Sequence, residues 1–318
     1  MLLGYTWIQW LFFFYFYSFF GWCFESAYVS ILKRKPVNRG FIRGPFLPLY
    51  GTGALMMLIV SHPFADSLPL TFLAGCVGAT ALEYVTGVTM EALFKVRYWD
   101  YSNQKFNFQG QICLSSTLAW GVLTVFMTRV LHRPVEALAL EIPQGVLTAL
   151  TMVVSLYFVA DFTLSFKAAL DLRDVLVKME QAKQELERMQ KRLDVILAVA
   201  GENWESVKKG LGQNYSDTAA SLAQRRGELA VSIEKRFEKL RELLPKTDQL
   251  RGRADELLDL RSRFRLNLER PEVTHFLKDF WKRSMLSGNP NMVSRKFEGA
   301  LDELKKAAAE YQRGQKKK

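Results

Sequence analysis

Four acidic residues lie inside stretches that are otherwise almost entirely apolar: Glu25, Glu83, Glu91 and Asp161. An ionisable side chain at membrane depth costs about 2.5–3.5 kcal/mol or more, so it usually pairs with another group or serves a binding site. Glu83 and Glu91 flank Gly87 at a spacing of four, which places all three on one stripe of a helix. Carboxylates in such a row can bind a polar ligand or act as general bases.

A basic loop follows the first of these acids and reads VNRGFIRGPFLPLYG over residues 37–51. Its glycines permit close backbone approach, and its prolines stiffen the path. Arg39 and Arg43 offer planar guanidinium groups that fit carboxylate or phosphate. The loop can therefore bind an anionic ligand, pair with the intramembrane glutamates, or only anchor the chain at the basic side of the membrane.

A second polar stretch lies within residues 98–121, where Asp100, Asn107 and Gln111 accompany several aromatic residues. The aromatic residues alone would form an ordinary interfacial belt, and the added polar groups exceed what a belt requires. We therefore predict a cytoplasm-facing polar cavity that binds an anionic or amphiphilic ligand. Its expected ligand-binding residues are Glu25, Arg39, Arg43, Glu83, Glu91, Asp100 and Asn107.

Simpler interpretations of the acids stay open. Glu91 can extend to the interface or pair with Lys95 one turn later, Glu83 can be a structural buried carboxylate, and Asp161 can be interfacial. His62, His132 and His275 are scattered without the spacing of a metal ligand set. We therefore expect no metal and no cofactor, and no catalytic residue can be assigned.

The elements that must position these groups are membrane helices. A hydrocarbon core of about 30 Å needs roughly 20 apolar residues, and five stretches qualify as candidates. They cover residues 5–32, 46–61, 70–94, 112–131 and 145–166. The second is short and begins in a Gly/Pro-rich segment, so it can also be a re-entrant or broken helix.

The distribution of lysine and arginine predicts the orientation of these spans. Loops 33–44 and 95–111 are basic, whereas loop 62–69 has no Lys or Arg and loop 132–144 has only Arg133. We therefore expect a multi-pass protein of the inner (plasma) membrane. Its N-terminus faces outside, and its C-terminal half lies in the cytoplasm.

That second half differs sharply in composition from the first. The formal net charge of +11 divides into about +2 over residues 1–166 and about +9 over residues 167–318. Leu172, Met179 and Leu186 begin a repeat of seven, which is typical of a coiled coil. The sequence thus predicts an all-α fold. Residues 1–166 form a transmembrane bundle of about five helices, and residues 167–318 form a cytoplasmic, coiled-coil-like helical domain.

The excess positive charge of the second half can form a solvated helix face or contact anionic lipid headgroups. Nucleic-acid binding is not expected, because acids are interleaved throughout and no recognition motif is present. The glycine-rich phosphate-binding motifs are also absent, so the chain supplies no nucleotide motor of its own.

The order of several motifs resembles a known family. The motifs are GW-x-x-E ending at Glu25, then NRGFIRGPFLPLYGTGA, E-x-x-x-G-x-x-x-E ending at Glu91, WDYS with a following FN-x-x-G, and WG. This series resembles the CmpB-like family of bacterial type IV ABC-transporter membrane proteins over about residues 15–125. The resemblance returns weakly in NPNMVSRKFEGALDELKK near residues 289–306, and RYWDYS stands where the family usually has a doubled Trp.

The resemblance implies family membership and a membrane location. Our first hypothesis is a permease-like transporter component whose partners are membrane lipids and a separate ATPase subunit or a second copy. Two other functions stay open at this point. One is a membrane enzyme acting on a lipid-linked substrate, with Glu83 or Glu91 as general base and the arginines on phosphate. The other is a membrane-anchored scaffold that works through its coiled coil.

Overall fold

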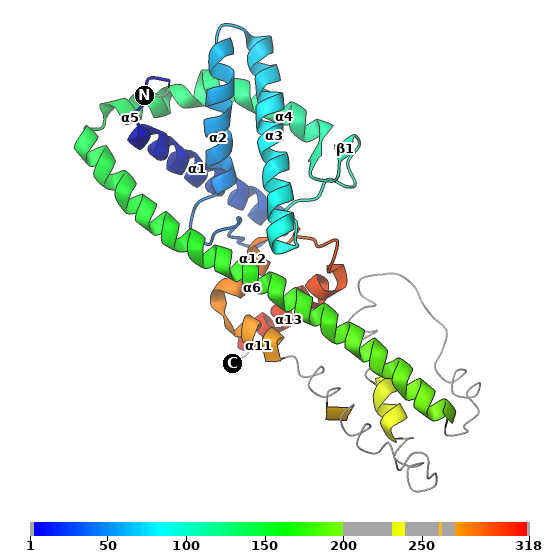
Figure 1. Cartoon of the computed structure of the whole chain (residues 1–318). Helices are drawn as coiled ribbons and strands as arrows, with labels where there is room; N and C mark the ends of the chain where they lie inside the picture. The colour runs from blue at the N-terminus through cyan, green and yellow to red at the C-terminus, as the bar shows by residue number, and fades with distance from the viewer. Residues whose placement is uncertain (1–2, 200–230, 239–260, 263–270, 317–318) are drawn as a thin grey trace. The chain divides into compact units, whose positions relative to one another are not determined.

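The computed structural model describes residues 3–199, 231–238, 261–262 and 271–316. The described part is almost entirely helical (Figure 1). Contacts divide the chain into two compact units, and each is described by itself. The first contains residues 1–173 and 279–295, and the second contains residues 174–278 and 296–318. This division follows contacts rather than solvent, so the membrane and cytoplasmic domains divided at residue 166 stay a prediction.

The first unit is built around four helices: α1 (Trp7–Lys33), α2 (Pro48–Ser61), α3 (Leu68–Phe94) and α4 (Leu114–Phe126). α2 packs between α1 and α3, and α4 packs on α3 (Figure 1). A capping box of Thr6 and Gln9 starts α1, and left-handed residues at Arg34 and Lys95 end α1 and α3. Both of these helix ends lead into the loops that carry the predicted polar residues.

Close helix approach in this unit depends on small residues. A Cβ at Gly51 of α2 would overlap the backbone and side chains of α1, and one at Gly75 of α3 would overlap Thr124 of α4. Aromatic and sulfur-containing side chains fill the space between the helices, with Phe13 fully buried and Met57 nearly so. These contacts fix the helices as a packed group rather than as independent spans.

The remaining elements of the first unit are short, apart from the long α6. The turn η1 (His62–Phe64) joins α2 to α3, and the strands β1 (Asn107–Phe108) and β2 (Ile112–Cys113) pair as an antiparallel hairpin before α4. A π-helical turn η2 (Met127–Leu131) joins α4 to α5 (His132–Glu141). α6 (Gln144–Val199) runs on into the second unit, and α12 (Phe280–Gly288) belongs to the first.

Within the described residues, three helical stretches are long and apolar enough to cross a membrane by length and composition: Leu68–Phe94, Leu114–Glu141 and Gln144–Leu193. Their outward side chains are apolar and strongly exposed, with exposed fractions of 72% for Val77, 62% for Val122 and 75% for Leu156. A surface of this kind is suited to lipid rather than to water. The membrane class and the helical fold are therefore as predicted, and the predicted count of five is taken up below.

The second unit contains the later part of α6, α11 (Pro271–Lys278) and α13 (Glu298–Lys316). α11 contacts α13. Phe276 on α11 and Leu301 and Leu304 on α13 are buried. Met179 and Leu186 of the predicted heptad seam are also buried. The coiled coil itself stays a prediction, and the helices expected over much of residues 200–270 lie outside the described part.

Candidate functional site

Glu25 is held by groups from two other segments. Its carboxylate accepts a hydrogen bond from Arg39 Nε at 3.2 Å and one from Tyr50 Oη on α2 at 2.8 Å. The backbone N–H of Arg39 donates to Ser26 Oγ, one residue further along α1. The basic loop therefore folds back onto α1, and a loop arginine pairs with the glutamate that precedes it.

Glu83 is the most buried of the acids predicted to bind the ligand, with an exposed fraction of 4%. Its carboxylate accepts hydrogen bonds from Tyr101 Oη at 3.0 Å, Trp120 Nε1 at 3.0 Å and Ser116 Oγ at 3.3 Å. These partners are three neutral donors rather than an arginine. Two come from α4 and one from the loop before it, so Glu83 joins α3 to both.

Glu91 pairs with Arg97. From the sequence, Arg97 contributed only to the basic charge of loop 95–111, which predicts the orientation of the membrane spans. Arg97 Nη2 lies 2.7 Å from Glu91 Oε2, and the Arg97 side chain is 3% exposed. Gln111 Nε2 donates to the same carboxylate at 2.7 Å, and Arg97 Nη1 donates to the Gln109 carbonyl at 2.9 Å. Arg97 also pairs with Asp100, three residues later, at 3.4 Å. This opposite charge close by in the sequence was the available signal that Arg97 forms an ion pair.

The stripe of Glu83, Gly87 and Glu91 thus has a defined partner. A Cβ at Gly87 would overlap the Gln111 side chain, so the glycine lets the loop lie directly on α3. The two glutamates receive donors from the same loop, through Tyr101 and Gln111. The stripe is a docking face for the loop of residues 95–113.

Asp100 and Asn107 form hydrogen bonds within that loop and so fix its backbone. Asp100 Oδ1 accepts hydrogen bonds from Ser102 Oγ at 2.6 Å and from the Ser102 N–H at 3.1 Å. Partial burial raises the pKa of the Asp100 carboxyl, but the Ser102 hydrogen bonds and the charges of Arg97 and Arg295 outweigh it and hold the pKa below its usual range. Asn107 donates to the carbonyls of Ser102 and Gln104 and accepts from the Gly110 N–H.

A segment from near the C-terminus completes this region. The backbones of Arg97 and Val293 exchange hydrogen bonds of 2.7 and 3.0 Å, and Ser294 Oγ donates to the Lys95 carbonyl at 2.6 Å. Arg295 Nη2 donates to the Gln109 carbonyl at 2.9 Å. Residues 279–295 are therefore a structural part of the first unit, although residues 174–278 separate them from the rest of it in the chain.

Asn289 joins this segment to the basic loop, and its side chain is buried, with an exposed fraction of 1%. Its Oδ1 accepts from Arg39 Nη1 at 3.1 Å, and its Nδ2 donates to the Gly40 carbonyl at 2.9 Å. Asn289 thus fixes the arginine that pairs with Glu25.

Tyr101 donates to Glu83 and lies within electrostatic range of Glu25. Burial raises the pKa of the Tyr101 hydroxyl, and the negative charges of Glu83 and Glu25 raise it further. Glu25 on α1 and Glu83 on α3 therefore belong to one electrostatic network that includes Tyr50 and Tyr101.

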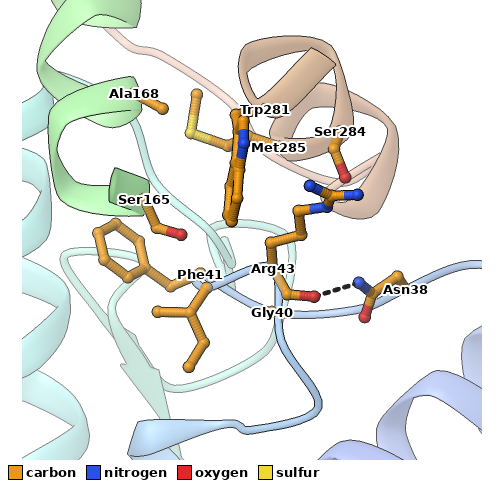
Figure 2. Close-up of a pocket in the computed structure, with 10 residues that line it drawn as sticks. Asn38, Gly40, Phe41, Arg43, Ser165, Ala168, Trp281, Ser284 and Met285 are labelled. Carbon is orange, nitrogen blue, oxygen red and sulfur yellow. Dashed lines mark hydrogen bonds between the residues drawn. The ribbon is translucent and has the colours of Figure 1, made fainter. Parts of the chain in front are cut away.

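Two of the predicted residues lie apart from the network's centre. Asn107 stands on the exposed hairpin, and Arg43 lies in a small pocket beside α12 (Figure 2).

The long apolar helices and the polar network define a polytopic helical membrane protein. Residues 12–166 match the family described as "Putative ABC-transporter type IV", which confirms the resemblance found in the motifs. The match ends before the segment of residues 279–295. Neither the curated proteins nor the solved structures gave a match to the chain.

Proposed function

We propose that the protein is the permease-like membrane component of a transporter that works with a separate ATPase. The observation that carries this proposal is the polar network among α1, α2, α3 and the loop of residues 95–113. Membrane helices rarely hold such charges without a task. The membrane class and the family match over residues 12–166 support a transport role.

In this proposal α1 and α2 also lie in the membrane, which gives the five spans expected from the sequence. α1 has 27 residues with Glu25 and Lys33 as its charged groups, and it exposes 52% of Phe20 and 67% of Phe24. α2 has 14 residues, about 21 Å at 1.5 Å per residue, which is short for a span. Its place between α1 and α3 favours a membrane position.

Because basic loops follow α1 and α3, we infer that the network faces the cytoplasm. There it would bind an anionic or amphiphilic ligand. Arg39 can leave Glu25 for an anionic group, because Tyr50 still donates to the glutamate. The proposed binding residues are those of the network and its loop: Glu25, Arg39, Glu83, Glu91, Asp100 and Asn107.

Purification from native membranes tests this function. The full-length tagged chain should retain an ATPase that is identified by mass spectrometry and that hydrolyses ATP in lipid nanodiscs. A tagged, unrelated multi-pass protein from the same cells is the control.

The outcomes also separate the alternatives. A chain that retains no ATPase but chemically alters a bound lipid would replace the proposal with the membrane enzyme. A soluble non-ATPase partner that binds through residues 167–318 would favour the scaffold.

A further inference from the structure

A pocket in the first unit lies among three segments that are distant in the sequence (Figure 2). The basic loop forms one side, the end of the apolar part of α6 forms the second, and α12 forms the third. Its lining includes Asn38, Arg43, Ser165, Ala168, Trp281 and Ser284.

Arg43 is held in this pocket by aromatic rings. Its guanidinium carbon lies 4.1 Å from the ring centre of Phe280 and 4.5 Å from that of Trp281. Such contacts use the faces of the rings and leave the N–H groups at the guanidinium edge available. None of the side-chain hydrogen bonds or ion pairs found in the described ranges uses these N–H groups.

Two hydroxyl groups line the pocket of the guanidinium. Ser284 on α12 points toward it, whereas the Trp281 ring stands between Ser165 on α6 and the guanidinium (Figure 2). The Asn38 side chain donates to the Arg43 carbonyl at 2.5 Å and so fixes the backbone from which the arginine projects. The pocket therefore presents one oriented cation with one hydroxyl donor, Ser284, beside it.

Two acidic groups lie nearby, and Asp161 Oδ1 is among the buried atoms without a hydrogen-bond partner in the described part of the chain. Asp161 is close enough to act electrostatically on Arg43, and its Oδ2 accepts from the Gly44 N–H at 2.6 Å. Asp171 pairs with Lys282 at 2.7 Å. Asp161 thus partly balances the charge of Arg43 without taking up its N–H groups.

We propose that this pocket binds a phosphate group, with Arg43 as a bidentate donor and Ser284 as a hydroxyl donor. A planar guanidinium matches two phosphate oxygens in a bidentate pair. The phosphate can belong to a lipid headgroup or to a small soluble compound. The lipid source rests on the proposed function in one respect, namely that Ser165 and Ala168 lie at the membrane boundary.

The test measures binding to the full-length chain in detergent by native mass spectrometry. The probes are phosphatidylglycerol, diacylglycerol as the lipid without phosphate, and inorganic phosphate. We expect phosphatidylglycerol or inorganic phosphate to bind the native chain, and diacylglycerol to bind much more weakly. Arg43→Gln should weaken phosphate binding about tenfold, and Ser284→Ala should weaken it several-fold without removing the stacked arginine.

Lys35→Gln is the matched control, because it removes one exposed charge from the same loop outside the pocket. Its affinity should change less than about twofold. Binding of phosphatidylglycerol alone would assign the lipid source, and binding of inorganic phosphate would assign a soluble one.

Equal losses in Arg43→Gln and Lys35→Gln, or no loss in Arg43→Gln and Ser284→Ala, would overturn the proposal. The measurement needs no ATPase, so its failure is distinct from failure of the transport proposal.

Discussion

Replacing Glu83 with glutamine tests whether this buried carboxylate is charged. The carboxylate accepts three hydrogen bonds, and Trp120 Nε1 can act only as a donor. Glutamine can keep its oxygen toward Trp120 and Ser116 and turn its amide toward the Tyr101 oxygen. The contacts then survive as neutral hydrogen bonds, each weaker than a bond to a charged group by about 1 kcal/mol.

The three weakened bonds should together destabilise the first unit by about 3 kcal/mol. For a unit of this size, that corresponds to a fall in Tm of about 6–12 °C. Thermal unfolding of the detergent-purified Glu83→Gln chain measures this, with Glu141→Gln as a control at an exposed acid of α5. Trp120→Phe removes one donor and should cost about 1–2 kcal/mol. An unchanged Tm in Glu83→Gln would show that Glu83 is already neutral, and would refute this reasoning.

Three further substitutions test the positioning of the loop. Arg97→Gln leaves Glu91 without its buried partner and should lower the free energy of unfolding by about 3–5 kcal/mol. Lys95→Gln nearby should leave it almost unchanged, and equal Tm values for the two variants would contradict the ion pair. Gly87→Ala should displace Gln111 and cost about 1–3 kcal/mol, while Gly53→Ala has open space and should be neutral or stabilising; thermal unfolding again decides. Asn289→Ala removes the acceptor of Arg39, so hydrogen exchange of residues 289–295 should accelerate at least about tenfold relative to Ser287→Ala, and unchanged protection would show that the segment is held without it.

The features that could be predicted from the sequence depend on residues close together in the chain. The period of four placed Glu83, Gly87 and Glu91 on one face of α3, because helix geometry depends on neighbours in the sequence. Length and apolar composition likewise predicted the spans that form α3, α4 and α6.

The partners of these residues could not be predicted in the same way. Arg97 was counted as one charge among several in a basic loop, although it is the buried partner of Glu91. Arg43 was expected beside the glutamates and instead stacks on Phe280 and Trp281. Such contacts join positions far apart in the chain, and periodicity contains no information about them.

The segment of residues 279–295 shows the same limit most clearly. Its hydrogen bonds to Lys95 and Arg97 depend on backbone groups, which every sequence has. The weak return of the family resemblance near residues 289–306 was the only signal that this segment belongs with the first unit.

The central claim is that the polar network of a membrane bundle is reached from the cytoplasm. Its most direct test is maleimide labelling of spheroplasts that express single-cysteine chains, with Cys23, Cys76 and Cys113 replaced. A cysteine at Asp66, in the turn between α2 and α3, should react with an impermeant maleimide in intact spheroplasts. A cysteine at Asn107, on the hairpin of the network loop, should react only after the membrane is permeabilised. Labelling of the Asn107 position from outside would contradict the account.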